Sequence, residues 1–173
     1  MESFRSILLI VTICIWVVWA LLVIINVIVW INDNLLCNSG NSYTSKVPNT
    51  KLIQETINYT KPILERNRIR KFPIYKVYYY KHKKYLGLFN GGIVIYLKSN
   101  TDIPTLVDTT LHEIMHYIQS QSNKKFNLYE EYTRTYGYYR NPFEVESRQF
   151  AAEHTPGCLE YLVSRNLIIT QQI

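Results

Sequence analysis

The motif H-E-x-x-H at residues 112–116 is the part of this 173-residue chain most able to do chemistry. It lies in an apolar run with helical spacing, so we expect His112 and His116 to project from one face of a helix in successive turns. Two imidazoles placed in this way can bind one zinc ion, and Glu113 can take a proton from water on the metal. The alternative is an exposed helix with two solvated histidines, but the apolar neighbours indicate a helix that packs into a core.

A zinc ion that catalyses hydrolysis normally has three protein ligands and one open position, so a third ligand must lie elsewhere. The segment 141–147, NPFEVES, predicts the start of a second helix, with its Asn-Pro pair as the N-cap and first helical residue. Glu144 would lie in the first turn of that helix. Glu146 competes for the role, but it lies about 200° round the helix from Glu144, so only one can face the metal. We favour Glu144, and His154 is a further alternative.

These two segments resemble the gluzincin group of zinc metallopeptidases, in which a glutamate opens a second helix as E-x-x-[SA]. They are also similar to the stretch E-x-E-A-x-x-F-A-A of membrane-linked and antirepressor-cleaving peptidases, which reads E-V-E-S-R-Q-F-A-A from residue 144. The resemblance covers roughly residues 74–154. It implies a zincin-like fold, one zinc ion and hydrolysis of a peptide or protein substrate. Matched position by position, it implies that His112, His116 and Glu144 are the metal ligands and that Glu113 is the general base.

The chain departs from the family pattern four residues after the expected ligand glutamate, where an Asp or Asn often orients a histidine. Arg148 stands there, and a cation cannot accept an imidazole N–H. Asp108, one turn before His112, either accepts that bond or acts only as an acid near the helix start. The developing oxyanion needs a second donor besides the metal. Three tyrosines just before the second motif are candidates: Tyr136, Tyr138 and Tyr139.

Residues 7–31 form an apolar run without any charge. At about 1.5 Å per residue, a helix of this length spans a bilayer of about 30 Å with some tilt. The run is longer than the core of a signal peptide, and no cleavage site of small residues follows it. We therefore expect residues 1–32 to be an N-terminal transmembrane anchor that attaches a single-pass protein to the membrane through residues 7–31.

The charges beside this run predict its orientation. Arg5 precedes it and no basic residue follows before Lys46, which places the N-terminus in the cytosol and the C-terminal domain outside the cytosol. The glycosylation sequon at residues 58–60 agrees with this orientation. In an oxidising compartment Cys37 and Cys158 can pair, and the alternative is two free thiols.

The remainder of the chain, about 140 residues, is long enough for one domain. Residues 33–50 are polar and rich in Asn and Ser, which predicts a stalk before a zincin-like metallopeptidase domain at residues 51–173. Within that domain we expect a helix over 51–68 that breaks at Pro62, because proline interrupts a helix. We then expect a strand over 74–80.

A hairpin should follow, with strands at 85–89 and 93–97 around Asn-Gly-Gly. Pro104 then opens the helix that carries the two histidines, and a tyrosine-rich loop and C-terminal helices complete the chain. This order predicts an α+β fold with a small antiparallel sheet, preceded by a transmembrane helix. In the resembled family, the strand before the metal helix, here 93–97, binds extended substrate through its backbone.

The formal net charge of +6 comes mostly from a basic, tyrosine-containing cluster between Lys61 and Lys84. We interpret it as a solvated face or a surface for anionic head groups, and we expect no nucleic-acid partner. The sequence as a whole predicts a membrane-anchored zinc metallopeptidase. Two alternatives are a non-catalytic zincin-like domain that binds a partner and a structural protein without metal. The intact Glu113 favours the enzyme.

Overall fold

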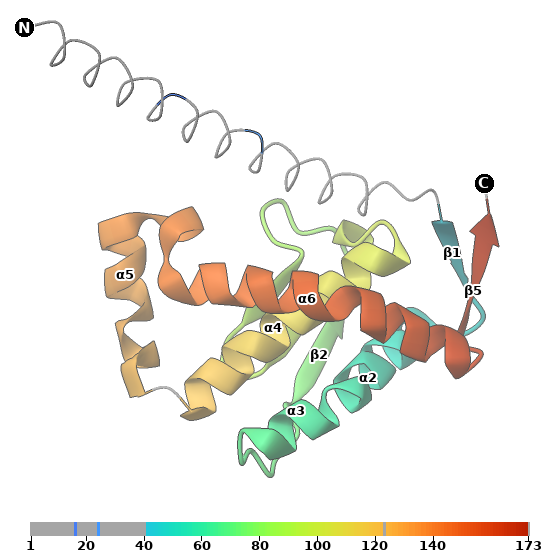
Figure 1. The fold of residues 1–173 in the computed structure, drawn as a ribbon, viewed down its shortest axis with the longest axis horizontal. Coiled ribbons are helices and arrows are strands. Elements are labelled where there is room, and N and C mark those ends of the chain that lie inside the picture. The colour runs from blue at the N-terminus through green and yellow to red at the C-terminus, as the bar shows by residue number, and fades with distance from the viewer. Residues whose placement is uncertain (1–15, 17–23, 25–40, 123, 173) are drawn as a thin grey trace, which may run out of the picture. The chain divides into compact units, whose positions relative to one another are not determined.

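The computed structural model describes residues 41–122 and 124–172, together with Trp16 and Ile24 (Figure 1). Residues 42–172 form one compact unit. The helices and strands in chain order are β1 (Asn41–Ser45), α2 (Asn49–Tyr59), α3 (Lys61–Arg66), β2 (Tyr75–Tyr78), β3 (Gly87–Phe89), β4 (Ile93–Tyr96), α4 (Ile103–Ser122), α5 (Tyr129–Tyr136), α6 (Pro142–Ser164) and β5 (Ile168–Gln172).

The three-stranded sheet has the order β2-β4-β3 and is mixed. The predicted hairpin is present, because β3 and β4 run antiparallel on either side of the Asn-Gly-Gly turn. Strand β4, however, inserts between β3 and β2 and runs parallel to β2, with Tyr75 opposite Ile93. The expectation of an antiparallel sheet is therefore wrong. Within this sheet, each strand runs opposite to the strand before it in the chain. However, β2 pairs with β4 and not with β3, and β2 and β4 run in the same direction.

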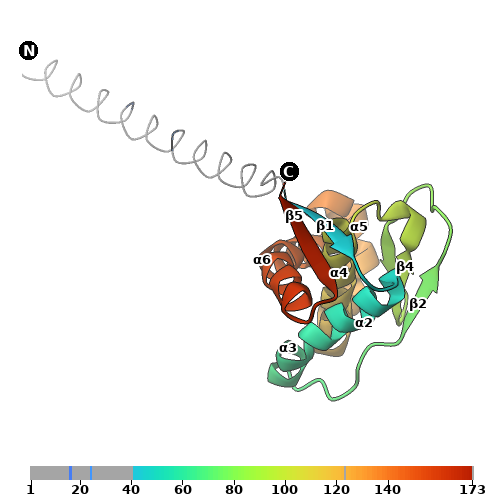
Figure 2. The same cartoon turned by 90° about the vertical axis from the view of Figure 1, so that its right-hand side faces the viewer.

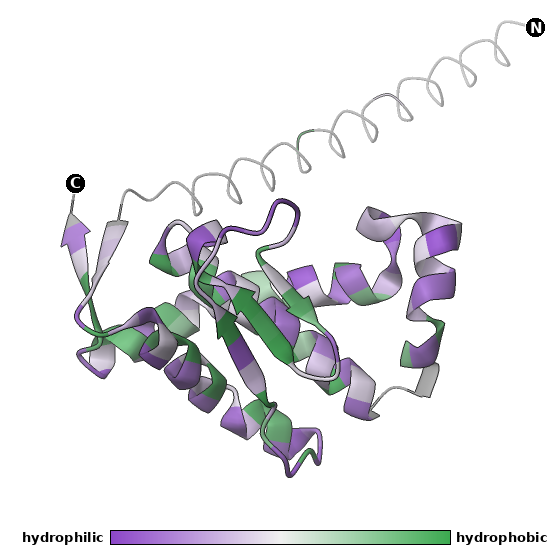
Figure 3. Cartoon of the chain, turned by 180° about the vertical axis from the view of Figure 1, so that it is seen from behind, coloured by the Kyte–Doolittle hydropathy of each residue, from purple (hydrophilic) through white to green (hydrophobic). Residues whose placement is uncertain are grey.

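The helices cover one face of this sheet. Figure 2 shows α4 between α6 and the sheet, and α4 contacts α6, α2, β3 and β4. Seen from behind in Figure 3, no helix of residues 41–122 and 124–172 lies over the other face of the sheet. The side chains of β2 alternate accordingly: Tyr75 and Val77 are half-buried, whereas Lys76 and Tyr78 are exposed. The result is a two-layer α+β unit whose core lies between the sheet and the helices.

Helix α4 is the central element of that core, and five of its apolar side chains are almost fully buried: Leu106, Val107, Leu111, Ile114 and Ile118. Burying a side chain of this size fully stabilises a fold by about 1.5–3 kcal/mol. The helix begins where Asp102 accepts a hydrogen bond of 2.8 Å from the N–H of Thr105, an N-cap interaction. Packing and capping together fix the helix that carries the histidine motif.

The predicted fold class also included a transmembrane helix, and this part needs correction. Among residues 41–122 and 124–172 no helix is both long enough and apolar enough to cross a membrane. The longest, α4 and α6, each carry ionisable side chains on several turns. Residues 7–31, on which the anchor and its orientation were predicted, lie outside the described residues apart from Trp16 and Ile24. The described fold is an α+β unit with a small mixed sheet.

Several elements differ from their predicted form. The helix expected over 51–68 is two helices, α2 and α3, separated at Thr60 ahead of Pro62, as the proline indicated. Strand β1 lies within the segment 33–50 expected as a stalk, and it pairs with β5 (Figure 2). The expected tyrosine-rich loop contains helix α5, and the C-terminal helices are one continuous helix, α6.

Candidate metal centre

Helix α4 presents His112 and His116 side by side, with ring centroids 4.8 Å apart. Glu144, in the first turn of α6, lies against both rings. Its Oε2 is 3.3 Å from His112 Nε2, and its Oε1 is 3.1 Å from His116 Nε2. The three possible ligand atoms all lie within 4.8 Å of one another. The structure therefore brings together the three residues that the sequence nominated as metal ligands.

The start of α6 determines which carboxylate reaches the histidines. The Asn141 side chain caps this helix by accepting a 3.0 Å hydrogen bond from the N–H of Phe143. Its amide also donates to Tyr129 O and Thr133 Oγ1 of α5, at 3.1 and 2.8 Å. With the helix start held in this way, Glu144 is 1% exposed and faces inward, whereas Glu146 is exposed. The predicted preference for Glu144 over Glu146 agrees with this geometry.

The electrostatics around Glu144 keep it ionised. Burial raises the pKa of this carboxyl, but the interactions with His112, His116 and Tyr129 lower it by more, to well below its usual range. The Tyr129 hydroxyl donates a hydrogen bond to Oε1, and Arg148 Nη1 lies 3.8 Å from Oε2. A buried anion surrounded by donors is a suitable partner for a cation.

The pKa of His116 is raised by the same carboxylate that His116 helps to keep ionised. Burial lowers it, but the hydrogen bond to Glu144 and the negative charges of Glu113 and Glu144 raise it above its ordinary value. In the protein alone, the raised pKa of His116 favours its protonated form beside the carboxylate. Metal binding to such a cluster displaces protons from its ligands.

The donor set fits zinc. Two imidazole nitrogens and one carboxylate, with a fourth position open to a cleft, are the ligands of catalytic zinc sites. One buried atom supports this fit, because Glu144 Oε2 has no hydrogen-bond partner among the described residues. That oxygen lies 3.3 Å from His112 Nε2 and 3.8 Å from Arg148 Nη1, and a bound cation would supply the close partner that it lacks among the described residues.

Glu113 is a second buried carboxylate beside the cluster. It is 6% exposed, and its Oε2 has no hydrogen-bond partner within the described part of the chain. Burial raises the pKa of Glu113 to about 8, the charge of Glu144 adds to the rise, and attraction to His116 opposes it. In the metal-free protein a carboxyl with this pKa is mostly protonated at neutral pH, and the charge of a bound cation would favour the ionised form that a general base needs.

Gly87 of β3 provides the space for this carboxylate. A Cβ atom there would lie 2.9 Å from both Cγ and Oε1 of Glu113, and 2.8 Å from Thr109 Cγ2. Only glycine allows β3 to approach α4 this closely. Gly87 was not predicted as a site residue, because its neighbour Glu113 is distant in the chain and no local pattern connects the two.

The cluster opens into a cleft of about 840 Å³ that contains His112, Glu113, His116 and Glu144. Strand β3 forms one border, and α5 with the segment that follows it forms another. Of the three tyrosines considered as oxyanion donors, Tyr138 and Tyr139 line the cleft, whereas Tyr136 is not among its lining residues. Burial and the nearby Glu144 raise the pKa of Tyr138, so this hydroxyl keeps its proton at neutral pH.

Other residues considered from the sequence lie elsewhere. His154 packs against Phe150, with ring centroids 4.4 Å apart, and is not part of the cluster. Asp108 is exposed by its surface area; desolvation raises the pKa of its carboxyl, and the charge of His112 opposes this rise. Cys158 is fully buried with a free thiol, while its proposed partner Cys37 lies outside the described residues.

Two further residues contact the cluster from behind. His116 Nδ1 lies 2.9 Å from Gln119 Oε1 and 3.2 Å from Ser147 Oγ. Both are buried, and neither was assigned a role from the sequence. The sequence spacing gave a weak indication of these contacts, because Gln119 is one helical turn after His116 and Ser147 is one turn after Glu144.

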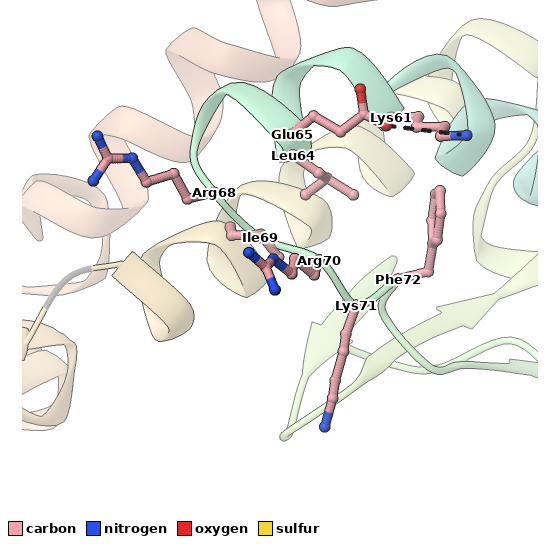
Figure 4. Close-up of a pocket in the computed structure, with 8 residues that line it drawn as sticks. All are labelled: Lys61, Leu64, Glu65, Arg68, Ile69, Arg70, Lys71 and Phe72. Carbon is pink, nitrogen blue, oxygen red and sulfur yellow. Dashed lines mark ion pairs between the residues drawn. The ribbon is translucent and has the colours of Figure 1, made fainter.

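A second hollow, of about 950 Å³, lies beside α3 and the segment that follows it (Figure 4). It is lined by several basic side chains, which belong to the cluster noted in the sequence. They do not converge, because Arg68 and Lys71 point away from one another in Figure 4. Lys61 is paired with Glu65 at 4.0 Å. This surface therefore offers no built site comparable to the His-His-Glu cluster.

Comparison with known proteins adds no further guide. No protein-family model matches the chain, and neither the curated proteins nor the solved structures contain a match. The gluzincin resemblance consequently depends on the two motifs and on the geometry described above.

Proposed function

We propose that this protein is a zinc-dependent peptidase that hydrolyses peptide bonds. His112, His116 and Glu144 would hold one zinc ion, and Glu113 would be the general base. The observation that supports this most strongly is the contact of the Glu144 carboxylate with both imidazoles beside a cleft that also contains Glu113. Bound zinc would polarise the scissile carbonyl and acidify its water ligand.

The remaining steps belong to the side chains of the protein. Glu113 would accept a proton from the attacking water and pass it to the leaving amine, which is consistent with its burial beside the cluster and with its unpaired Oε2 among the described residues. Tyr138, which also lines the cleft, would donate a hydrogen bond to the oxyanion. The raised pKa of this hydroxyl keeps it protonated and therefore able to donate.

The substrate would lie along β3. Because the sheet order among the described residues is β2-β4-β3, β3 is an edge strand whose outer backbone groups would pair with an extended peptide. The family resemblance predicted this role for residues 93–97, but β4 is central and is paired on both sides. Residues of β3 and Glu113 line the same cleft, so a peptide paired with β3 would lie near Glu113.

The substitution E113Q tests this proposal. A degenerate peptide library is incubated with the zinc-loaded parent, with E113Q and with E146Q as a matched change of the exposed neighbouring glutamate. We expect E113Q to retain zinc while cleavage falls about 100-fold or more, because an amide cannot take the proton. E146Q should cleave like the parent. Equal cleavage by parent and E113Q would exclude Glu113 as the base.

A further inference from the structure

Gln119 connects His116 of the metal cluster to Glu146, the glutamate that does not contact the histidines. Its side chain is 2% exposed, and its Oε1 lies 2.9 Å from His116 Nδ1. Its Nε2 donates to two acceptors on α6, the backbone oxygen of Phe143 at 3.0 Å and Glu146 Oε2 at 2.8 Å. The amide thus spans the gap between α4 and the first turn of α6.

The two acceptors determine which way the amide points. A backbone carbonyl and a carboxylate both require a donor, and only the NH₂ end of Gln119 can supply two. The oxygen end must then face His116. An amide oxygen only accepts, so it favours the histidine form that carries a proton on Nδ1. In that form Nε2, the atom that faces Glu144, is the nitrogen available to a metal.

We propose that Gln119 and Glu146 are positioning residues for His116, with Glu146 acting only through Gln119. The inference depends on the proposed zinc site but not on peptide hydrolysis. Arg148 stands at the position where the resembled family often has a carboxylate or amide, and here the hydrogen-bond acceptor for His116 comes from α4 itself. Ser147, at 3.2 Å from the same nitrogen, is a second and longer contact.

Zinc affinity of the full chain, measured by competition with a chelator of known affinity, tests the inference. Q119L removes the acceptor and both donors at nearly constant volume. Q121L makes the same change two residues later on α4, where the side chain is exposed. E146L removes one acceptor of the amide, and E146Q keeps an oxygen that can accept while removing the charge.

We expect Q119L to weaken zinc binding about 10-fold or more, the usual effect of losing a partner behind a metal ligand. E146L should weaken binding by about 3-fold, because Phe143 O still holds the amide. E146Q and Q121L should match the parent. The double variant Q119L/E146L should match Q119L, because Glu146 has no path to His116 without the amide.

The outcomes separate the possible failures. A parent that binds no zinc would overturn the proposed function and this inference together. A zinc-binding parent with unchanged affinity in Q119L would overturn the inference alone, and thermal unfolding of the metal-free proteins would then show Gln119 to be only structural. Additive losses in the double variant, or a loss in E146Q equal to that in E146L, would show that Glu146 acts by its charge. If Q119L does not fold, the zinc affinities of E146L and E146Q, which change an exposed residue, still test the inference.

Discussion

Replacing Gly87 by alanine should displace the general base without touching the metal ligands. The added Cβ would lie 2.9 Å from Cγ and Oε1 of Glu113, about 0.5 Å inside the 3.4 Å at which ordinary van der Waals contact begins. Thr109 Cγ2, at 2.8 Å, blocks relief in another direction. Because Glu113 Oε2 has no hydrogen-bond partner among the described residues, this side chain is the group free to move.

The size of the effect follows from that displacement. A misplacement of about 1 Å in a reacting group can reduce a rate by about 100-fold. A shift of about half that distance should lower kcat/KM about 10-fold, which corresponds to about 1.4 kcal/mol of transition-state stabilisation. The extra methyl group should also lower the free energy of unfolding by about 1–3 kcal/mol. Zinc affinity should stay within about 2-fold of the parent, because the added Cβ has none of the three ligands among its nearest neighbours.

The assay is hydrolysis of a fluorogenic peptide, selected from the library, at saturating zinc by the parent, G87A, E113Q and the double variant G87A/E113Q. If alanine acts by moving Glu113, the double variant should have the same residual rate as E113Q alone. A full additional 10-fold loss in the double variant would show that alanine acts in another way, for example on peptide pairing with β3. An unchanged rate in G87A would refute the placement of the base.

Three further predictions concern the same cleft. H116A should lose zinc binding, whereas H154A, a histidine packed on Phe150, should bind zinc like the parent in the same chelator competition. In chelator, the parent should lose stability relative to E113Q as the pH rises from 4.5 towards 8. The folded pKa of about 8 lies above the ordinary 4.5, so the folded state binds the proton more tightly. Denaturant titrations should show this difference growing by at most about 1.4 kcal/mol per pH unit, and a constant difference would contradict the burial argument. Y138F should lower kcat about 10-fold at saturating zinc, with Y136F as the control outside the cleft, and equal kcat values would exclude Tyr138 as the oxyanion donor.

The parts of the site that follow from local sequence were predictable. The period of the apolar residues around His112 and His116 identifies a helix packed into the core, and the Asn-Pro pair before Phe143 identifies the start of the second helix. These two local signals placed Glu144 in a first turn and facing inward, where the structure has it. The break between α2 and α3 was predictable for the same reason, since proline acts on its own turn.

The parts that depend on contacts between distant segments were not predictable. Strand β2 pairs with β4 although β3 lies between them in the chain. The hairpin signal predicted the β3–β4 pair but contained no information on this parallel pairing. Gly87 matters because it lies against Glu113, which belongs to another element. Gln119 matters because it contacts Glu146 on a different helix. Strand β5 has as its partner β1, which lies near the other end of the chain. No local periodicity contains such information.

The central claim is that His112, His116 and Glu144 form one zinc site. It is tested most directly by the zinc content of the folded full chain after equilibration with a small excess of zinc and removal of unbound metal. Parallel samples of E144Q and E146Q carry the same substitution two residues apart. We predict about one zinc per chain in the parent and in E146Q, and little or none in E144Q, because an amide is a poor substitute for a carboxylate ligand. A folded parent without zinc, or full zinc content in E144Q, would contradict the claim.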